Sequence, residues 1–195
     1  MDTQDVLTEF RDAEALLEGH FLLSSGLHSE MYLQCARVLM NPQRAARVCE
    51  ALADKIRNTI EEKIDIVVSP AMGGVIVGYE MGRQLGVDAI FTERVDGEFE
   101  LRRGFEIPQG ANVLMSEDVV TTGLSSRECI ETIKAYGGNV VAASCLVDRS
   151  NGKVDVGVPL VSLMGLEIAA YSEDNLPEHM KNTEAVKPGS RDLKK

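Results

Sequence analysis

Short apolar runs and longer amphipathic stretches alternate along most of the chain after Ile64. The apolar runs read IDIVVSP, DAIFTE, NVLMSED and NVVAASCLVD, and VPLVSLMGLEI adds another near the end. Between them, GVIVGYEMGRQLG and LSSRECIETIKAYGG have the apolar spacing of helices. Such an alternation predicts right-handed strand–helix–strand units and a central, mostly parallel sheet that is flanked by helices. We therefore expect an α/β fold.

The residues before this alternation predict two helices and a separate pair of strands. Apolar side chains recur at helical spacing from Thr3 to Leu17, which predicts an opening helix that ends by Gly19. Two short apolar runs on either side of the turn 24–26 predict two strands, which we interpret as a hood or flap. Asn41 and Pro42 then begin a helix that runs to about residue 60.

The length of 195 residues fits a single domain. We expect it to consist of an N-terminal helix and hood (1–40), an α/β core (41–175) and a C-terminal tail (176–195), of which the last residues, KPGSRDLKK, are loose.

One connection departs from the alternation. Between AIFTE and NVLMSED lies RVDGEFELRRGFEIPQGA, which is too poor in apolar residues to be a crossover helix. Long irregular connections in compact domains are usually lids or binding loops. This one carries Arg94, Arg102 and Arg103. We expect the two flanking strands to be antiparallel neighbours and part of the connection to be a hairpin.

Charge and cysteine usage exclude several classes of function. The formal net charge is −11, and no basic patch for a nucleic-acid backbone is visible, so small molecules are the expected partners. The four cysteines are scattered without CxxC spacing, which predicts reduced thiols and no zinc site. The first residues lack the pattern of a signal peptide, and no apolar run approaches a membrane span. We expect a cytoplasmic protein that does not bind membranes.

The stretch VLMSEDVVTTGLSS carries the strongest functional signal. Its apolar strand ends in Glu117 and Asp118, and a Thr, Gly and Ser turn then leads into a helix. Backbone N–H groups at a helix start bind phosphate, while the two carboxylates suit hydroxyls or a metal. The spacing matches neither a GxxxxGK[ST] loop nor GxGxxG. The alternative is an ordinary strand-to-helix turn, but adjacent carboxylates at a buried strand end are costly without partners.

This stretch resembles the phosphoribosyl pyrophosphate signature of type I phosphoribosyltransferases, a family with the expected α/β fold, an N-terminal hood or flap and a long mobile loop. The resemblance implies that Glu117 and Asp118 hold the ribose hydroxyls. It implies that the loop which follows them wraps the 5-phosphate: Val119, Val120, Thr121, Thr122, Gly123, Leu124 and Ser125. The stretch SPAMGG is similar to the family's pyrophosphate loop and adds Ala71, Met72, Gly73 and Gly74.

Two further stretches point to the acceptor base. GHFLLSSGLHSEMYLQCA is similar to the flap of orotate phosphoribosyltransferases, and CLVDRSNG extends the match. The resemblance implies that Arg149 pairs with the carboxylate of orotate, a contact suited to a planar guanidinium. It also implies that the base site is completed by residues of the flap and of the phosphate loop: Ser24, Ser25, Gly26, Tyr32 and Thr121.

The reaction that this resemblance implies moves ribose 5-phosphate from phosphoribosyl pyrophosphate to orotate. Asp118 would act together with Arg94, Arg102 and Arg103, and Mg²⁺ would be held mainly by the substrate, near Glu117 and Asp118. The resemblance also implies a homodimer whose loop reaches the neighbouring site. Many orotate enzymes carry lysines where this chain has Ser24 and Gly73.

Two alternatives stay open. A purine or xanthine phosphoribosyltransferase would share the phosphate signature but not the flap, and a non-catalytic regulator would sense phosphoribosyl pyrophosphate without turnover. His20, His28 and His179 have no metal-site spacing, and we expect them at surface or flap positions.

Overall fold

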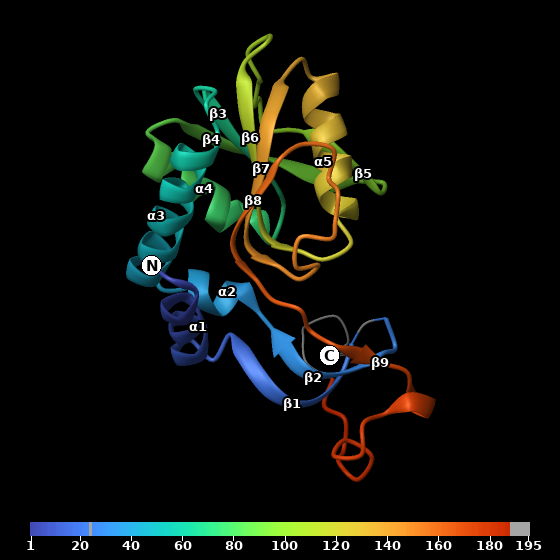
Figure 1. The fold of residues 1–195 in the computed structure, drawn as a ribbon. Helices are drawn as coiled ribbons and strands as arrows, with labels where there is room; N and C mark the ends of the chain where they lie inside the picture. Colours follow the sequence, from blue (N-terminus) through green and yellow to red (C-terminus); the bar gives the residue numbers. More distant parts are fainter. Residues whose placement is uncertain (24, 188–195) are drawn as a thin grey trace.

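The computed structural model describes residues 1–23 and 25–187, and its strands form two sheets there. The larger sheet has the order β5-β4-β3-β6-β7-β8. Its strands are β3 (Ile66–Pro70), β4 (Asp88–Val95), β5 (Glu98–Leu101), β6 (Asn112–Val120), β7 (Asn139–Asp148) and β8 (Leu160–Gly165). Neighbouring strands are parallel except β5, which is antiparallel to β4. The predicted α/β fold with a mostly parallel sheet is confirmed (Figure 1).

Helices cover both faces of this sheet. On one face, α3 (Pro42–Thr59) and α4 (Gly74–Leu85) pack into an apolar cluster that also takes in α1 (Thr3–Asp12) and α2 (Cys35–Leu39). On the other face, α5 (Leu124–Ala135) packs into a second cluster. Figure 1 shows α3 and α4 on one side of the strands and α5 on the other. The helix start expected at Asn41 is confirmed, because the Asn41 side chain accepts from the N–H of Arg44.

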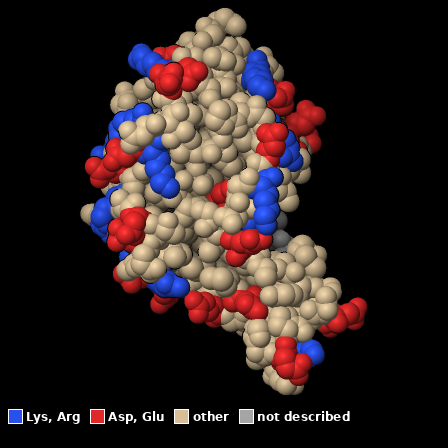
Figure 2. All heavy atoms as spheres, viewed as in Figure 1, with Lys and Arg blue, Asp and Glu red and all other residues tan. Residues whose placement is uncertain are grey.

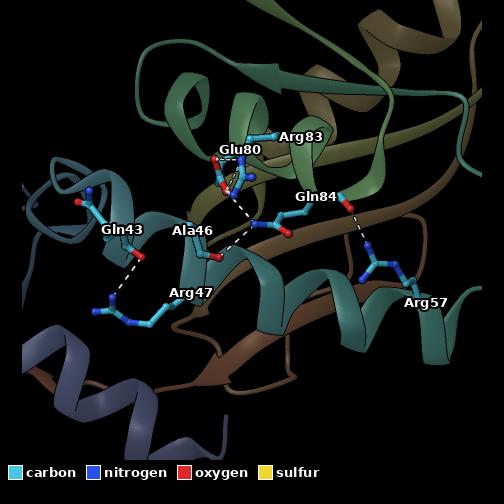
Figure 3. A network of polar contacts seen from close by, with 7 residues as sticks. All are labelled: Gln43, Ala46, Arg47, Arg57, Glu80, Arg83 and Gln84. Atoms are coloured by element: carbon cyan, nitrogen blue, oxygen red, sulfur yellow. Dashed lines mark hydrogen bonds and ion pairs between the residues drawn. The ribbon is translucent and has the colours of Figure 1, made fainter.

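Helix α4 lies unusually close to the sheet and is tied to α3. A Cβ on Gly78 would lie 2.1 Å from Oγ of Ser69, so only glycine permits this approach. On the other side of α4, the Gln84 amide donates to Glu80 at 2.8 Å and to the carbonyl of Ala46 in α3 at 3.3 Å (Figure 3). These contacts fix the helix whose first turn follows the loop 71–74.

The smaller sheet forms a separate hood with the order β1-β2-β9. It consists of β1 (Leu16–Leu22), β2 (His28–Leu33) and β9 (Ala170–Tyr171), and the short 3-10 helix η1 (Glu173–Asn175) follows β9. The expected pair of strands is confirmed, but the expected opening helix was too long. It ends at Asp12, and Leu16 and Leu17 belong to β1, where they pair with Leu33 and Tyr32. Strand pairing overrides the helical spacing of these two leucines.

The polar connection after β4 contains the expected hairpin, because β4 and β5 pair between Thr92↔Leu101 and Val95↔Glu98. The expectation that the strands on either side of it, β4 and β6, are antiparallel neighbours was wrong. β3 lies between them and is parallel to both. β4 lies on one side of β3 and pairs with β5 along its own other edge, and β6 adds to the free side of β3.

Acidic and basic side chains alternate around the edge of the face in Figure 2, with a broad area of other residues between them. None of the helices within the described residues is both long and apolar enough to span a bilayer. Of the tail expected to be loose, residues 188–195 lie outside the described residues.

Candidate functional site

The two acids and the loop expected to bind phosphate lie at the carboxyl end of β6. Glu117 and Asp118 are within the strand, and Thr121 and Thr122 form an exposed turn after it. Gly123 has a φ of 71°, in the left-handed region that favours glycine, and precedes the first residue of α5. The N-terminus of a helix of this length presents N–H groups and the positive end of its dipole. The loop therefore has the layout expected for an anion site.

Burial perturbs both carboxyl groups. Desolvation raises the pKa of Glu117 to about 7, although a hydrogen bond from the Ser126 hydroxyl, 2.5 Å from Oε2, opposes the rise. The neighbouring Asp118 carboxyl adds to the rise. Desolvation also raises the pKa of Asp118, against the N–H of Val119, which donates to Oδ1 at 3.0 Å. At neutral pH, Glu117 is therefore divided between its protonated and charged forms.

The loop expected to bind pyrophosphate lies directly against Asp118. Ala71 and Met72 follow β3, their peptide bond is cis, and Gly73 and Gly74 begin α4. A Cβ on Gly73 would lie 2.8 Å from Oδ1 of Asp118. The structure thus brings two of the predicted stretches together, and a larger side chain at position 73 would have to displace the Asp118 carboxyl.

The three arginines expected to neutralise pyrophosphate lie on the β4–β5 hairpin and all form ion pairs. Arg94 pairs with Glu128 of α5 and lies over the ring of Phe99 at 4.2 Å. Arg102 and Arg103 both pair with Glu93, the former at 3.4 Å. The arginine ends of these pairs are solvent-accessible, and ion pairs at a surface contribute about 0–1 kcal/mol each, so a phosphate can displace the carboxylates.

The hairpin also reaches the pyrophosphate loop through the backbone. The N–H of Ala71 donates to the carbonyl of Thr92, at 2.8 Å, and Thr92 is the residue before Glu93. The cations and the loop are therefore neighbours along β4.

Arg149 lies at the end of β7, the strand that pairs with β6 in the larger sheet. Its N–H donates to the carbonyl of Val120 at 2.8 Å. Its Nε is buried and has no hydrogen-bond partner within the described residues, and burial lowers the pKa of the guanidinium. Cys35 lies close enough to affect Arg149 electrostatically, and its thiol donates to the carbonyl of Asp118 at 3.7 Å.

The hood carries the remaining predicted residues. Ser24 lies outside the described residues; Ser25 and Gly26 form an exposed turn, in which Gly26 has a φ of 82°. Tyr32 of β2 lies beside Phe21, with ring centroids 5.8 Å apart. None of the hydrogen bonds among the described residues joins Ser25 or Tyr32 to Arg149. His20 and His28 belong to the hood as expected, but both are buried.

Four residues around the site were not identified from the sequence. Ser126 holds Glu117, Glu93 and Glu128 hold the arginines, and Cys35 lies between Arg149 and Asp118. Ser126 was detectable in principle, because it follows the phosphate loop within the first turn of α5. The other three depend on contacts between distant parts of the chain, which no local pattern reports.

The donor atoms of the site suit a hard cation only in part. Carboxylate oxygens are ligands that Mg²⁺ accepts, and Glu117 and Asp118 supply them. Within residues 1–23 and 25–187, however, no group of three or more His, Cys, Asp or Glu side chains is arranged to hold a metal. The residues present therefore fit an ion that takes most of its ligands from a bound substrate.

The acid pair and glycine turn at the end of β6, beside the glycine loop at the end of β3, are the arrangement that the resemblance to phosphoribosyltransferases implied. The family model for the phosphoribosyl transferase domain matches residues 36–164. The crystal structure of orotate phosphoribosyltransferase from Aeropyrum pernix superposes with a TM-score of 0.67 at 26% identity, over 82% of this chain and 93% of that one.

Curated relatives extend the match to nearly the whole chain. The orotate phosphoribosyltransferase of Rhizorhabdus wittichii is 61% identical over 191 residues, which is 98% of this chain and 97% of that protein. The protein of the same name from Novosphingobium aromaticivorans is 62% identical over 187 residues, 96% of each. The chain belongs to the orotate phosphoribosyltransferase family.

Proposed function

We propose that this chain transfers ribose 5-phosphate from phosphoribosyl pyrophosphate to N1 of orotate, giving orotidine 5′-monophosphate and pyrophosphate in pyrimidine biosynthesis. The observation that carries the choice of base is Arg149. Its Nε is buried without a partner in the described residues, next to Cys35 and thus to the acid pair. A guanidinium whose buried Nε has no partner calls for an anionic, planar ligand, because leaving that N–H unpaired is costly. The carboxylate of orotate meets that requirement, whereas purine bases have none.

The residues around Arg149 take the roles that their positions support. Glu117 and Asp118 hold the ribose hydroxyls, and residues Val119–Ser125 receive the 5-phosphate at the start of α5. Ala71–Gly74 provide backbone for the pyrophosphate, close to Asp118. The ring nitrogen of orotate attacks the anomeric carbon, so no side chain has to act as a nucleophile.

The main electrostatic demand of the reaction is the charge of the departing pyrophosphate. Arg94, Arg102 and Arg103 are the cations of the β4–β5 hairpin, and they can exchange their carboxylate partners for phosphate oxygens. Mg²⁺, when bound with the substrate near Glu117 and Asp118, supplies further neutralisation. The hairpin and the hood, with Ser24–Gly26 and Tyr32, exclude water, which would otherwise compete with orotate.

The active form that we propose is a homodimer in which the hairpin serves the neighbouring site. One surface supports a self-association. Met72, just before α4, and Ile76 and Tyr79, in its first and second turns, are large apolar side chains that are 84%, 48% and 70% exposed. Apolar side chains so strongly exposed along one helix are typical of an interface.

We further propose that the chain works as one domain with three parts: the N-terminal helix and hood (1–40), the α/β core (41–175) and the tail (176–195). The reaction would take place in the cytoplasm. The scattered, reduced cysteines support the latter. All four are free and buried.

The experiment that tests the function follows the loss of orotate absorbance after phosphoribosyl pyrophosphate and Mg²⁺ are added to the purified protein. Guanine, hypoxanthine and xanthine are run as parallel acceptors. Orotate consumption that a chelator abolishes is the expected result. Turnover of a purine without turnover of orotate would overturn the proposal, and no turnover with any base would favour a regulator.

The role of Arg149 is tested by Arg149→Gln. Loss of charged hydrogen bonds is worth about 1.5–3 kcal/mol, so the KM for orotate should rise about 10- to 100-fold while the KM for phosphoribosyl pyrophosphate changes little. Arg11→Gln, which removes an exposed arginine that pairs with Glu18 at 3.7 Å, is the matched control. An unchanged KM for orotate in Arg149→Gln would remove the argument for this base.

A further inference from the structure

The C-terminal chain holds the hood sheet at both of its outer edges. On one edge, β9 pairs with β2, and the Ser29 hydroxyl donates to the carbonyl of Ala169 at 2.9 Å. The chain then passes through residues 176–187, which we call the clasp, and returns to the other edge. There the N–H of Leu22 donates to the carbonyl of Val186 at 2.9 Å, and the N–H of Val186 donates to the carbonyl of His20 at 2.8 Å.

Neither the hood nor the clasp belongs to the residues 36–164 that match the domain family. Figure 1 shows both together, apart from the larger sheet, with the clasp running beside the hood. A two-stranded hairpin is at best marginally stable in water, so the hood strands depend on what packs against them. The clasp and β9 supply that support.

A chain of hydrogen bonds, buried between the two histidines and partly buried at Thr183, links the hood to the clasp. Nε2 of His20 lies 2.6 Å from Nδ1 of His28, and Nδ1 of His20 lies 3.0 Å from the carbonyl oxygen and 2.9 Å from the hydroxyl oxygen of Thr183. The Thr183 hydroxyl is 2.8 Å from the carbonyl of Met180, to which it donates. Met180 is itself buried.

For neutral rings, the positions of the hydrogens in this hydrogen-bond chain follow from the donors and acceptors. The hydroxyl of Thr183 has one hydrogen, and Met180 receives it, so both oxygens of Thr183 can only accept from His20. His20 therefore carries a hydrogen on Nδ1. A neutral His20 then has a lone pair on Nε2, and His28 must donate to it from its own Nδ1. The order of donation is His28 to His20 to Thr183 to Met180.

Two alternatives explain these residues less well. The facing nitrogens of the two histidines are at hydrogen-bond distance, which leaves no space for a cation between them, and no metal group occurs within the described residues. The second link between hood and clasp, His179 with Glu30 at 2.9 Å, is mostly exposed and contributes little. The hydrogen-bond chain that passes through the buried side chains of His20 and His28 is the specific connection.

The hydrogen-bond chain lies next to the turn of the hood. β1 ends at Leu22 and β2 begins at His28, so the two histidines lie at the base of the turn between the strands. We propose that His20, His28 and Thr183 are positioning residues, which set the hood turn in the geometry that receives orotate. This inference rests on the proposed function, because it takes the hood to close over the base.

Kinetics of matched variants test the positioning role. His20→Phe keeps a ring but breaks the chain at both ends, and Thr183→Val removes only the hydroxyl. A net hydrogen bond is worth about a fivefold factor, so we expect the KM for orotate to rise about tenfold or more in His20→Phe and about fivefold in Thr183→Val. The KM for phosphoribosyl pyrophosphate should stay unchanged, and Thr183→Ser should restore the wild-type values.

Thr59→Val is the matched control, because the Thr59 hydroxyl donates only to the carbonyl of Lys55, at 2.7 Å, on α3. Variants of His20 and Thr183 that behave like this control would overturn the proposal. Equal rises in both KM values would also overturn it, since they would indicate general loss of structure.

A second measurement does not depend on activity. Nitrogen-15 NMR of the imidazole rings should find the hydrogen on Nδ1 in both His20 and His28 at neutral pH, and Thr183→Val should alter the His20 signals. A hydrogen on Nε2 of either ring would contradict the order of donation from His28 to His20 to Thr183. If the wild-type protein failed to consume orotate while both rings carried the expected hydrogens, the proposed function would be wrong. The hydrogen-bond link between the hood and the clasp would still be supported.

Discussion

Glu117 makes the stability of this protein depend on pH in a direction opposite to that of most carboxyl groups. Burial raises its pKa to about 7 from an ordinary value of 4.5. Between these two pH values the folded protein holds a proton that the unfolded chain has released. Stability therefore falls as the pH rises from about 4.5 to about 7, and above pH 7 the folded state carries the full cost of the buried charge.

The size of the effect follows from the shift. One pKa unit corresponds to about 1.4 kcal/mol, so the whole change is about 3 kcal/mol, and about 2 kcal/mol of it falls between pH 5 and pH 8 once partial exposure is allowed for. Glu117→Gln keeps the shape and removes the charge. Urea denaturation should find the variant and the wild type similar at pH 5, with the variant more stable by about 2 kcal/mol at pH 8.

Glu62→Gln controls for the loss of one charge, since Glu62 is exposed. Its difference in the free energy of unfolding from wild type should be the same at both pH values. A difference between Glu117→Gln and wild type that does not change with pH would refute the reasoning, because it would mean that the Glu117 carboxyl pays no desolvation cost when it ionises.

Three further results are expected. Gly73→Ala should weaken phosphoribosyl pyrophosphate binding about tenfold in calorimetry, because the new Cβ would lie 2.8 Å from Oδ1 of Asp118; unchanged affinity would contradict the close packing. Arg103→Ala should lower kcat about 100-fold if its cation meets the leaving group, whereas Glu93→Gln, which removes only the charge of the partner carboxyl, should change kcat less than about fivefold. Tyr79→Glu should convert a dimer to monomers in sedimentation, and a dimer that persists would place the interface elsewhere.

The parts of the fold that follow local rules were predictable. The alternation of strands and helices, the start of α3 at Asn41 and the hairpin after β4 are confirmed. The length of α1 was not predictable, because Leu16 and Leu17 have helical spacing and yet pair with Leu33 and Tyr32 in the hood. The order of β4, β3 and β6 depends on which side of β3 the chain returns to, and that is decided by the packing of the whole sheet.

In the candidate site, too, the residues that are adjacent in sequence were predictable and those brought together by the fold were not. Glu117, Asp118 and the loop after them are adjacent in sequence, so a local pattern identified them. Ser126, which donates to Glu117, belongs to the same stretch but was given no role from the sequence, whereas Cys35 comes from α2 and is brought to Asp118 only by the fold. The dependence of the hood on Thr183 was equally hidden, because a threonine in a polar segment has no distinguishing pattern until the fold brings it to His20.

Gly73 leaves the pyrophosphate loop without a lysine, and the arginines of the hairpin supply positive charge near that loop. With Asp118 2.8 Å from where a Cβ would stand, the pyrophosphate loop cannot carry a side chain at this position without moving the acid. The positive charge must then come from another element that reaches the same loop. β4 does so through the bond from Ala71 to Thr92, and the residue after Thr92 holds Arg102 and Arg103. The close approach of the glycine loop to the acid pair and the arginine-bearing hairpin therefore depend on each other, and a lysine introduced at position 73 should impair rather than improve the site.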